Sequence, residues 1–254
     1  MSKSRLLLGR RIIALLFCLL PLAMYGVTKR NADTEYLRGN YQQAIADYRD
    51  LLSRGISADL YYNLGNAYYR TDSLAEAILC YERALQLEPG DADIRFNLQF
   101  ARSKTIDKIT PESEMFFVTW YHALVNLTGV DQWAVTAIVS IVLALVLMLF
   151  YLFAPSLSVR KGSFYGSIAL LIVFLLSNLF AWQQKQMLEE RHGAIVMVPT
   201  VNVKKTPVKD AADAFVLHEG TRVDITDKSM KGWIGFRLAD GREGWITSRS
   251  IEEI

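Results

Sequence analysis

Hydrophobic residues gather into three long runs along the chain, and the segments between them mix polar and apolar positions. The runs are Ile12 to Val27, Trp133 to Ala154 and Phe164 to Trp182. The second has 22 residues and the third 19, and neither contains Asp, Glu, Lys, Arg or His. As helices they would reach about 33 Å and about 28 Å, close to the roughly 30 Å hydrocarbon core of a bilayer. The pattern predicts transmembrane helices over 133–154 and 164–182.

The first run has the layout of a signal sequence. Four basic residues precede it, which are Lys3, Arg5, Arg10 and Arg11. Its 16 residues would span about 24 Å, which is short for a full crossing. We therefore expect residues 1–28 to be a signal peptide cleaved near Gly26 or a retained signal anchor.

The basic residues beside the runs predict an orientation. Arg160 and Lys161 lie in the connection 155–163, which the positive-inside rule places in the cytoplasm. The basic N-terminus agrees. Residues 29–110 and 193–254 then lie on the opposite, extracytoplasmic side, and 111–132 form an interfacial linker. Because neither long run carries a charge, a transport pathway is disfavoured.

Residues 29–110 contain a repeat with a period of 34. This shift aligns Ala58–Leu64 with Ala92–Leu98, with six of seven positions identical or similar. Such a period is typical of stacked two-helix units. Leu64-Gly65, Tyr68, Ala77, Tyr81, Ala84 and Pro89 resemble the tetratricopeptide repeat, and Asp91 or Asp93 can cap a final helix. About two and a half repeats are present, so we expect this short array to rely on the membrane or on a partner.

The resemblance implies that the first helix of each repeat lines a concave groove for a peptide or a partner helix. The residues at such positions are Asp59, Tyr62, Asn63, Asn66, Tyr69, Arg70, Phe96 and Asn97. Amides can bond a peptide backbone and an arginine can bond a carboxylate. The alternative is that these residues only form a solvated helix face.

Short alternating runs broken by turn signals follow from residue 193. They are Ala194–Val196, Val201–Val203, Val223–Ile225, Trp233–Phe236 and Gly244–Ile246, with a hairpin signal at Asp240-Gly241. Their order, together with Glu219-Gly220, resembles bacterial SH3-like domains, which bind peptides or cell-wall stems in some proteins. We expect a small barrel with Trp245 in its core and Trp233 and Phe236 as peptide-binding surface residues.

Composition excludes several function classes. Residues 30–110 carry 10 basic and 12 acidic groups, and residues 183–254 carry 11 of each, so nucleic acid is not an expected partner. Cys18 and Cys80 define no disulfide framework, and the three histidines are scattered. No phosphate loop, nucleophile elbow or zinc helix is found, so we expect no cofactor, no metal and no catalysis.

The full arrangement is a multidomain membrane protein with helical repeats, a transmembrane hairpin and a small all-β barrel. This order resembles the tetratricopeptide/SH3 member of the bacterial aerotolerance-operon (Bat) proteins. The resemblance implies a bacterial inner-membrane location, von Willebrand-type membrane proteins as partners and a link to oxidative-stress tolerance. The sequence predicts a non-enzymatic scaffold, and the alternatives are a peptidoglycan sensor acting through the barrel or an enzyme with an unrecognised site.

Overall fold

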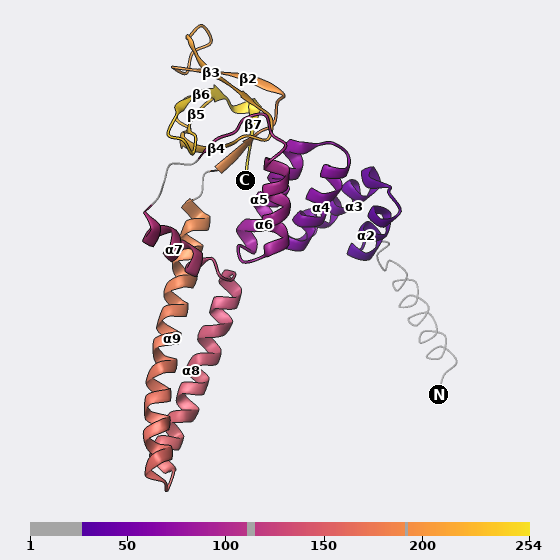
Figure 1. Ribbon diagram of the computed structural model, residues 1–254. Coiled ribbons are helices and arrows are strands. Elements are labelled where there is room, and N and C mark those ends of the chain that lie inside the picture. The colour runs from indigo at the N-terminus through magenta and orange to yellow at the C-terminus, as the bar shows by residue number, and fades with distance from the viewer. Residues whose placement is uncertain (1–26, 111–114, 191–192) are drawn as a thin grey trace, which may run out of the picture.

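The computed structural model of the protein describes residues 27–110, 115–190 and 193–254 (Figure 1). Within them, short helices form a stacked array, two long helices form an antiparallel hairpin, and the C-terminal residues form an antiparallel sheet. The array and the sheet lie side by side at one end of the hairpin, which projects away from both. The predicted signal segment falls almost entirely outside the described residues.

The array consists of α2 (Lys29–Leu37), α3 (Tyr41–Arg54), α4 (Ala58–Arg70), α5 (Leu74–Leu87) and α6 (Ala92–Arg102). Each helix packs on the next one in the chain, as expected for helical repeats. The predicted cap of the last helix is confirmed, because Asp91 Oδ1 accepts from the backbone amides of Asp93 (2.8 Å) and Ile94 (3.0 Å). The unit before α4 and α5 is also a helix pair, formed by α2 and α3.

Small residues stand where helices of the array cross closely. A Cβ atom on Gly65 of α4 would lie 2.7 Å from Cε1 of Tyr81 on α5. The Tyr81 ring is buried, and its hydroxyl donates to Asn66 Oδ1 (2.8 Å), so the ring is held in place. Gly65 therefore sets the distance between the two helices of the central repeat.

The hairpin contains the two helices of the described residues that are long and apolar enough to cross a membrane. They are α8 (Val130–Phe153) and α9 (Leu157–Glu190), and the shorter apolar helix α7 (Phe116–Val125) precedes them. Small and hydroxyl side chains are buried between α8 and α9, and Ser167 Oγ donates to the Ala144 carbonyl (3.2 Å). Small residues allow helices to pack closely where burial of apolar surface gives no driving force.

The connection within the hairpin differs from the prediction. Residues 155–163 were expected to form a loop, but α9 already begins at Leu157, so only residues 154–156 connect the helices. Arg160 and Lys161 are consequently helical. The charges of Arg160 and Lys161 separate the two apolar runs in the sequence, but they do not end the helix.

The C-terminal sheet comprises β1 (Gly193–Val196), β2 (Thr200–Lys204), β3 (Asp213–His218), β4 (Arg222–Asp227), β5 (Trp233–Arg237), β6 (Glu243–Thr247) and β7 (Ile251–Glu253). The strand order is β3-β2-β6-β5-β4-β1-β7, and every pairing is antiparallel. The sheet curls on itself (Figure 1). The buried residues of its core are aliphatic apart from Phe236. The predicted hairpin at Asp240-Gly241 is confirmed, with Gly241 at φ 84°.

The array leans on this sheet. Ile195 of β1 is fully buried, and it packs with residues of α5 and α6 rather than with the core of the sheet. Met197 and Ile254 join the same cluster. A Cβ atom on Gly220, in the turn before β4, would lie 2.9 Å from both Ile78 and Thr105 side chains. The sheet therefore covers the open end of the array, where a further repeat helix would otherwise pack.

The packing at Gly65 generates a test. Replacing Gly65 with Leu should destabilise the α4–α5 pair by about 1 to 3 kcal/mol, because the added side chain overlaps a ring that cannot move away. Hydrogen exchange of α4 and α5 in the full chain would measure the loss. Gly55→Leu is the matched control, since Gly55 has extended backbone and open space around its Cβ position. Equal protection in Gly65→Leu and the parent would contradict this packing.

Candidate functional site

We use the name concave face for the surface formed by α2, α4 and α6, the first helices of successive units, where the sequence predicts a groove. Six of the predicted groove residues form hydrogen bonds with other side chains of the array. They are Asp59, Tyr62, Asn63, Asn66, Arg70 and Asn97. Such bonds fix side-chain positions before a ligand arrives and so reduce the entropy lost on binding.

The centre of the face is a network between α4, α5 and α6. The Asn97 amide donates to the Tyr62 hydroxyl (3.0 Å) and to Asn66 Oδ1 (2.9 Å). Asn66 Oδ1 also accepts from the Tyr81 hydroxyl. Because both hydrogens of the Asn97 amide are used within the fold, this side chain can offer a ligand only its carbonyl oxygen.

A second network joins α2 to the rest of the face. Asp33 Oδ1 accepts from the Tyr48 hydroxyl (2.6 Å) and from the Asn63 amide (3.4 Å). Burial, reinforced by the nearby Asp33 carboxylate, raises the pKa of Tyr48, so its hydroxyl stays a donor. At the exposed edges of the face, Asp59 pairs with Lys29 (2.9 Å).

Aromatic rings on α6 remain uncovered beside these networks. Phe96 is 66% exposed and Phe100 is 45% exposed, and their rings lie parallel with centroids 6.3 Å apart. Tyr69 of α4 packs against Phe100 with a centroid distance of 5.7 Å. The ammonium group of Lys104 lies 5.2 Å from the Phe100 ring centroid. We call Phe96, Phe100, Tyr69 and Lys104 the aromatic shelf.

A second cation on the same face is Arg70, which follows Tyr69 in α4. The exposed Arg70 side chain donates from Nε to the Tyr36 hydroxyl (3.5 Å), which leaves its terminal N–H groups for other acceptors. A cavity of about 370 Å³ beside the shelf is lined by Tyr69, Asp72, Leu74 and Lys104. An exposed apolar surface on a face that also carries cations can accommodate a peptide that combines an apolar side chain with a carboxylate.

The second predicted site, on the sheet, is only partly at the surface. Phe236 was expected on the surface but is 1% exposed and belongs to the sheet core, so that expectation was wrong. It lies on β5 between Gly235 and Arg237, and its side chain points to the enclosed face of the curled sheet. Trp233 is half-buried. Trp245 was expected in the core but is also half-buried. Its ring covers Gly235, since a Cβ atom on Gly235 would lie 3.2 Å from Cη2 of Trp245.

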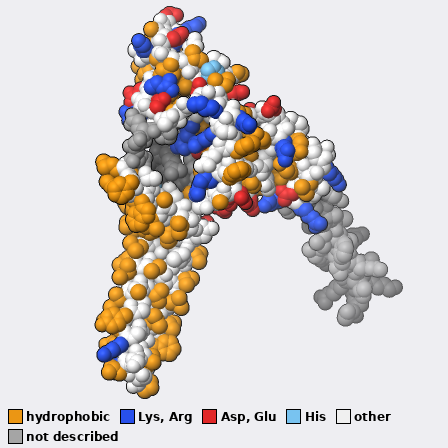
Figure 2. Space-filling model, viewed as in Figure 1, with side chains coloured by type: hydrophobic (Ala, Val, Ile, Leu, Met, Phe, Trp, Pro, Cys, Tyr) orange, Lys and Arg blue, Asp and Glu red, His pale blue; other side chains and the backbone are white. Residues whose placement is uncertain are grey.

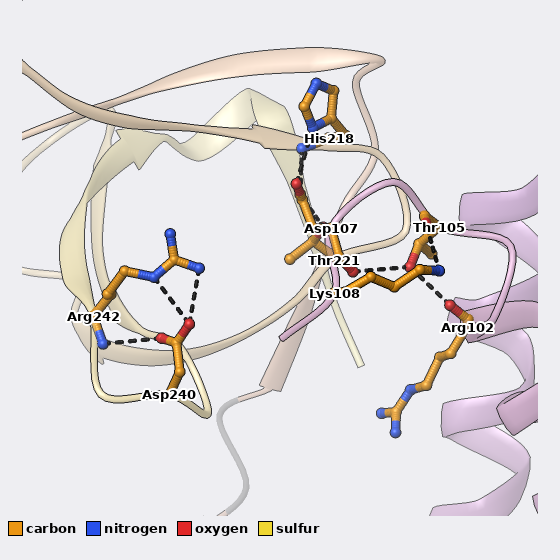
Figure 3. A network of polar contacts seen from close by, with 8 residues as sticks. All are labelled: Arg102, Thr105, Asp107, Lys108, His218, Thr221, Asp240 and Arg242. Carbon is orange, nitrogen blue, oxygen red and sulfur yellow. Dashed lines mark hydrogen bonds and ion pairs between the residues drawn. The ribbon is translucent and has the colours of Figure 1, made fainter. Parts of the chain in front are cut away.

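A polar junction holds the array and the sheet together (Figure 3). Asp107, in the segment after α6, accepts from the Thr221 hydroxyl (2.7 Å) and from the His218 backbone amide (2.7 Å). The His218 ring lies 3.0 Å from the second carboxylate oxygen. Burial opposes ionisation of Asp107, but the hydrogen bonds from Thr221 and His218 outweigh it and lower the pKa of the carboxyl.

A buried carboxylate on α5 is the second part of the junction. Glu82 is 4% exposed and pairs with Arg102 of α6 and with Arg222 of β4 (3.2 Å). On the outer side, Arg83 donates to Glu252 (3.1 Å) and to the Glu253 carbonyl (2.6 Å). Removing one member of a buried pair leaves a charge uncompensated, typically at about 3 to 5 kcal/mol.

The turn between α5 and α6 contacts the near end of the hairpin. A Cβ atom on Gly90 would lie 2.5 Å from the Leu127 carbonyl oxygen. At this end, the Gln184 amide of α9 donates to the Thr128 carbonyl (3.0 Å), and the Trp133 indole donates to the Val125 carbonyl (2.9 Å). The array thus contacts both the sheet and the near end of the hairpin.

Sequence reasoning missed part of the concave face. Tyr36, Asp33, Phe100 and Lys104 lie on it but were not predicted. The repeat period carried a signal for three of them, because a shift of 34 aligns Tyr36 with Arg70, Arg70 with Lys104 and Asn66 with Phe100. The junction residues had no such signal, since Asp107 and Thr221 are 114 positions apart.

Comparisons with known proteins identify one part of the chain. Residues 58–91, which cover α4, α5 and the turn after them, match the tetratricopeptide repeat family. This match confirms the repeat read from the 34-residue period. No curated protein matches the chain. Within the described residues, no cluster of three or more His, Cys, Asp or Glu side chains could hold a metal ion.

The junction at Asp107 predicts a response to acid. Its carboxyl has a lowered pKa in the folded chain, so the stability it contributes is present above the ordinary value of 3.8 and is lost as pH falls through the lower folded value. Between about pH 5 and about pH 3, hydrogen exchange of residues 105–109 and 218–222, corrected for intrinsic rates, should increase.

Two variants check this assignment. In Asp107→Asn, exchange of both segments should already be raised at neutral pH and should respond less to acid. Asp240→Asn is the control, because Asp240 bonds to Arg242 within its own hairpin (Figure 3) and not across the junction. An acid response of the parent that persists unchanged in Asp107→Asn would contradict the assignment.

Proposed function

We propose that this chain is a non-enzymatic, membrane-anchored scaffold that binds a partner protein through the concave face of its helical repeats. Tetratricopeptide repeats are protein–protein interaction modules, and residues 58–91 match that family. The observation that carries the proposal is the contrast within the face. Its polar side chains are held by hydrogen bonds inside the fold, whereas Phe96 and Phe100 remain exposed, with Lys104 over the Phe100 ring and Arg70 on the same face.

The hairpin supplies the anchor in this proposal. Helices α8 and α9 cross the bilayer, and Arg160 and Lys161 at the far tip face the cytoplasm, in accordance with the positive-inside rule. The array and the sheet then lie together on the extracytoplasmic side, because both connect to the near end of the hairpin. In a bacterial cell this side is the periplasm, and the anchor is a multi-pass one in the inner membrane.

The finer assignment follows from the resemblance in domain order. As in Bat proteins, the partners would be membrane proteins with von Willebrand-type domains, and the complex would contribute to tolerance of oxidative stress. The C-terminal sheet acts in this account as an SH3-like domain whose main task is to support the array. The nearly complete burial of Phe236 supports this role over cell-wall binding, since it removes one of the two aromatic residues expected in a peptide site.

A binding experiment tests the proposal. The full chain, tagged and solubilised in mild detergent, should capture its partner from bacterial membranes, and the double variant Phe96→Ala with Arg70→Ala should capture at least about tenfold less, because exposed aromatic and arginine side chains are typical binding anchors. Both side chains are exposed, so each substitution should cost under about 0.5 kcal/mol of stability.

The controls separate the two faces of the molecule. Ile56→Ala removes an equally exposed apolar side chain, 70% accessible, from the loop between α3 and α4, and should leave capture unchanged. Trp233→Ala tests the sheet. If the double variant keeps every partner and Trp233→Ala instead abolishes binding to purified peptidoglycan, the scaffold proposal is wrong and the wall-sensor alternative is right.

A further inference from the structure

A cavity lies at the far tip of the hairpin, away from the array and the sheet. It has a volume of about 260 Å³ and is lined by Tyr151, Leu157, Arg160, Lys161, Phe164 and Tyr165. On the face shown in Figure 2, the hairpin is apolar along its length and carries basic side chains near this tip. At this tip, two cationic side chains therefore lie beside a cluster of aromatic rings, at the end of an apolar helix pair.

The two cations have no acidic neighbour. No Asp or Glu occurs between Asp131 and Glu189. Asp131 is in the first turn of α8 and Glu189 is at the end of α9, so both lie at the opposite end of the hairpin. A helix of 24 residues is about 36 Å long, several times the roughly 8 Å Debye length at physiological ionic strength. The charges of Arg160 and Lys161 are therefore not neutralised by the hairpin itself.

Arg160 is held in position at the cavity. Its Nε donates to the Tyr151 carbonyl in the last turn of α8 (3.1 Å), and its guanidinium carbon lies 5.6 Å from the Tyr151 ring centroid. Of the five N–H donors of an arginine, the four on the terminal nitrogens remain. A guanidinium fixed in this way is suited to bind two oxygens of a phosphate group at once.

Aromatic and aliphatic side chains form the rest of the cavity lining. The Tyr151 and Phe164 rings are 5.3 Å apart, and the Phe164 and Tyr165 rings are 5.5 Å apart. Tyr165 is 69% exposed, and Leu157 is also exposed. Tyrosine side chains favour the level of lipid headgroups, and the exposed apolar groups can contact the glycerol and the first carbons of an acyl chain.

We propose that this cavity binds the headgroup of an anionic phospholipid, with Arg160 and Lys161 on the phosphodiester and Leu157 and Phe164 against the lipid backbone. The inference rests on the proposed crossing of the membrane by α8 and α9. A zwitterionic lipid is disfavoured, because its ammonium group would lie near two cations with no carboxylate to receive it. A basic pocket between membrane helices on the cytoplasmic side is a recognised form of site for acidic headgroups.

The test measures lipid preference of the full chain. The protein is reconstituted with trace amounts of labelled phosphatidylglycerol or phosphatidylcholine of the same chain length, and retention of each lipid is compared. We expect phosphatidylglycerol to be preferred by on the order of fivefold per basic side chain. The preference should vanish in Arg160→Gln with Lys161→Gln, and it should fall several-fold in Arg160→Lys, which keeps the charge but loses the planar guanidinium. Lys185→Gln, a charge removed from the other end of α9, should change nothing.

Three outcomes would overturn the site. Equal retention of the two lipids would show that there is no headgroup selectivity. An unchanged preference for phosphatidylglycerol in Arg160→Lys would show that positive charge alone explains the effect. Positive charge of this kind is already needed to orient the hairpin in the membrane and requires no headgroup site. Displacement of phosphatidylglycerol by inorganic phosphate at the same concentration would show a site for free anions rather than for a lipid.

Cysteine labelling tests the membrane crossing separately, so that a wrong lipid site can be distinguished from a wrong membrane proposal. In a Cys18→Ser background, Ser158→Cys and Lys104→Cys are treated with an impermeant thiol reagent in sealed cells. Burial raises the pKa of Cys80 to about 12, so that this thiol does not react. Labelling of Lys104→Cys alone supports the crossing, whereas labelling of both positions would refute it whatever the lipid preference.

Discussion

The open end of a short helical array is the constraint on which this structure depends. A repeat stack buries its apolar surface only between neighbours, so its last helix needs a cover. Here that cover is the C-terminal sheet, whose Ile195 enters the cluster of α5 and α6 as a side chain of the next repeat would. Two and a half repeats are therefore sufficient for a stable array, because the sheet takes the place of the next repeat helix.

Polar contacts make this cover specific. Glu82 comes from α5 of the array and Asp107 from the segment after α6. Both accept hydrogen bonds from the C-terminal part, from Arg222 and from Thr221 with His218. Such bonds have a defined geometry, so they select one orientation of the sheet among those that would bury Ile195. Because the α5–α6 turn also touches the hairpin at Leu127, the concave face has a defined position relative to the proposed membrane surface.

The sequence predicted the parts of this fold that depend on local pattern. The 34-residue period located the repeats, the uncharged runs located α8 and α9, and alternation located five strands. It missed β3, whose Ala214–Leu217 segment is continuously apolar rather than alternating, and β7, which has only three residues. Phe236 was placed on the surface because the resemblance to SH3-like domains implies a peptide groove beside this segment. Alternation alone would place Trp233 and Phe236 on opposite faces of β5.

Contacts between distant segments were beyond prediction. The sequence indicated that the array needed support but pointed to the membrane or to a partner rather than to the sheet. Nothing in the residues near Glu82 or Asp107 indicates a partner more than 100 positions away. The exposed aromatic shelf was predicted only in part. Phe96 and Tyr69 were among the predicted groove residues, whereas Phe100 was not, although the 34-residue shift aligns it with Asn66.

Native-state hydrogen exchange of the full chain in Ile246→Ala tests most directly whether the sheet supports the array. Ile246 is buried in the sheet core and has no part in the junction, so truncating it should weaken the sheet by about 2 to 5 kcal/mol without touching the helices. If the sheet is the cover of the array, protection of α5 and α6 falls together with that of the strands, and α2 at the far end is affected least. Loss of protection confined to the strands, with α5 and α6 unchanged, would contradict the account.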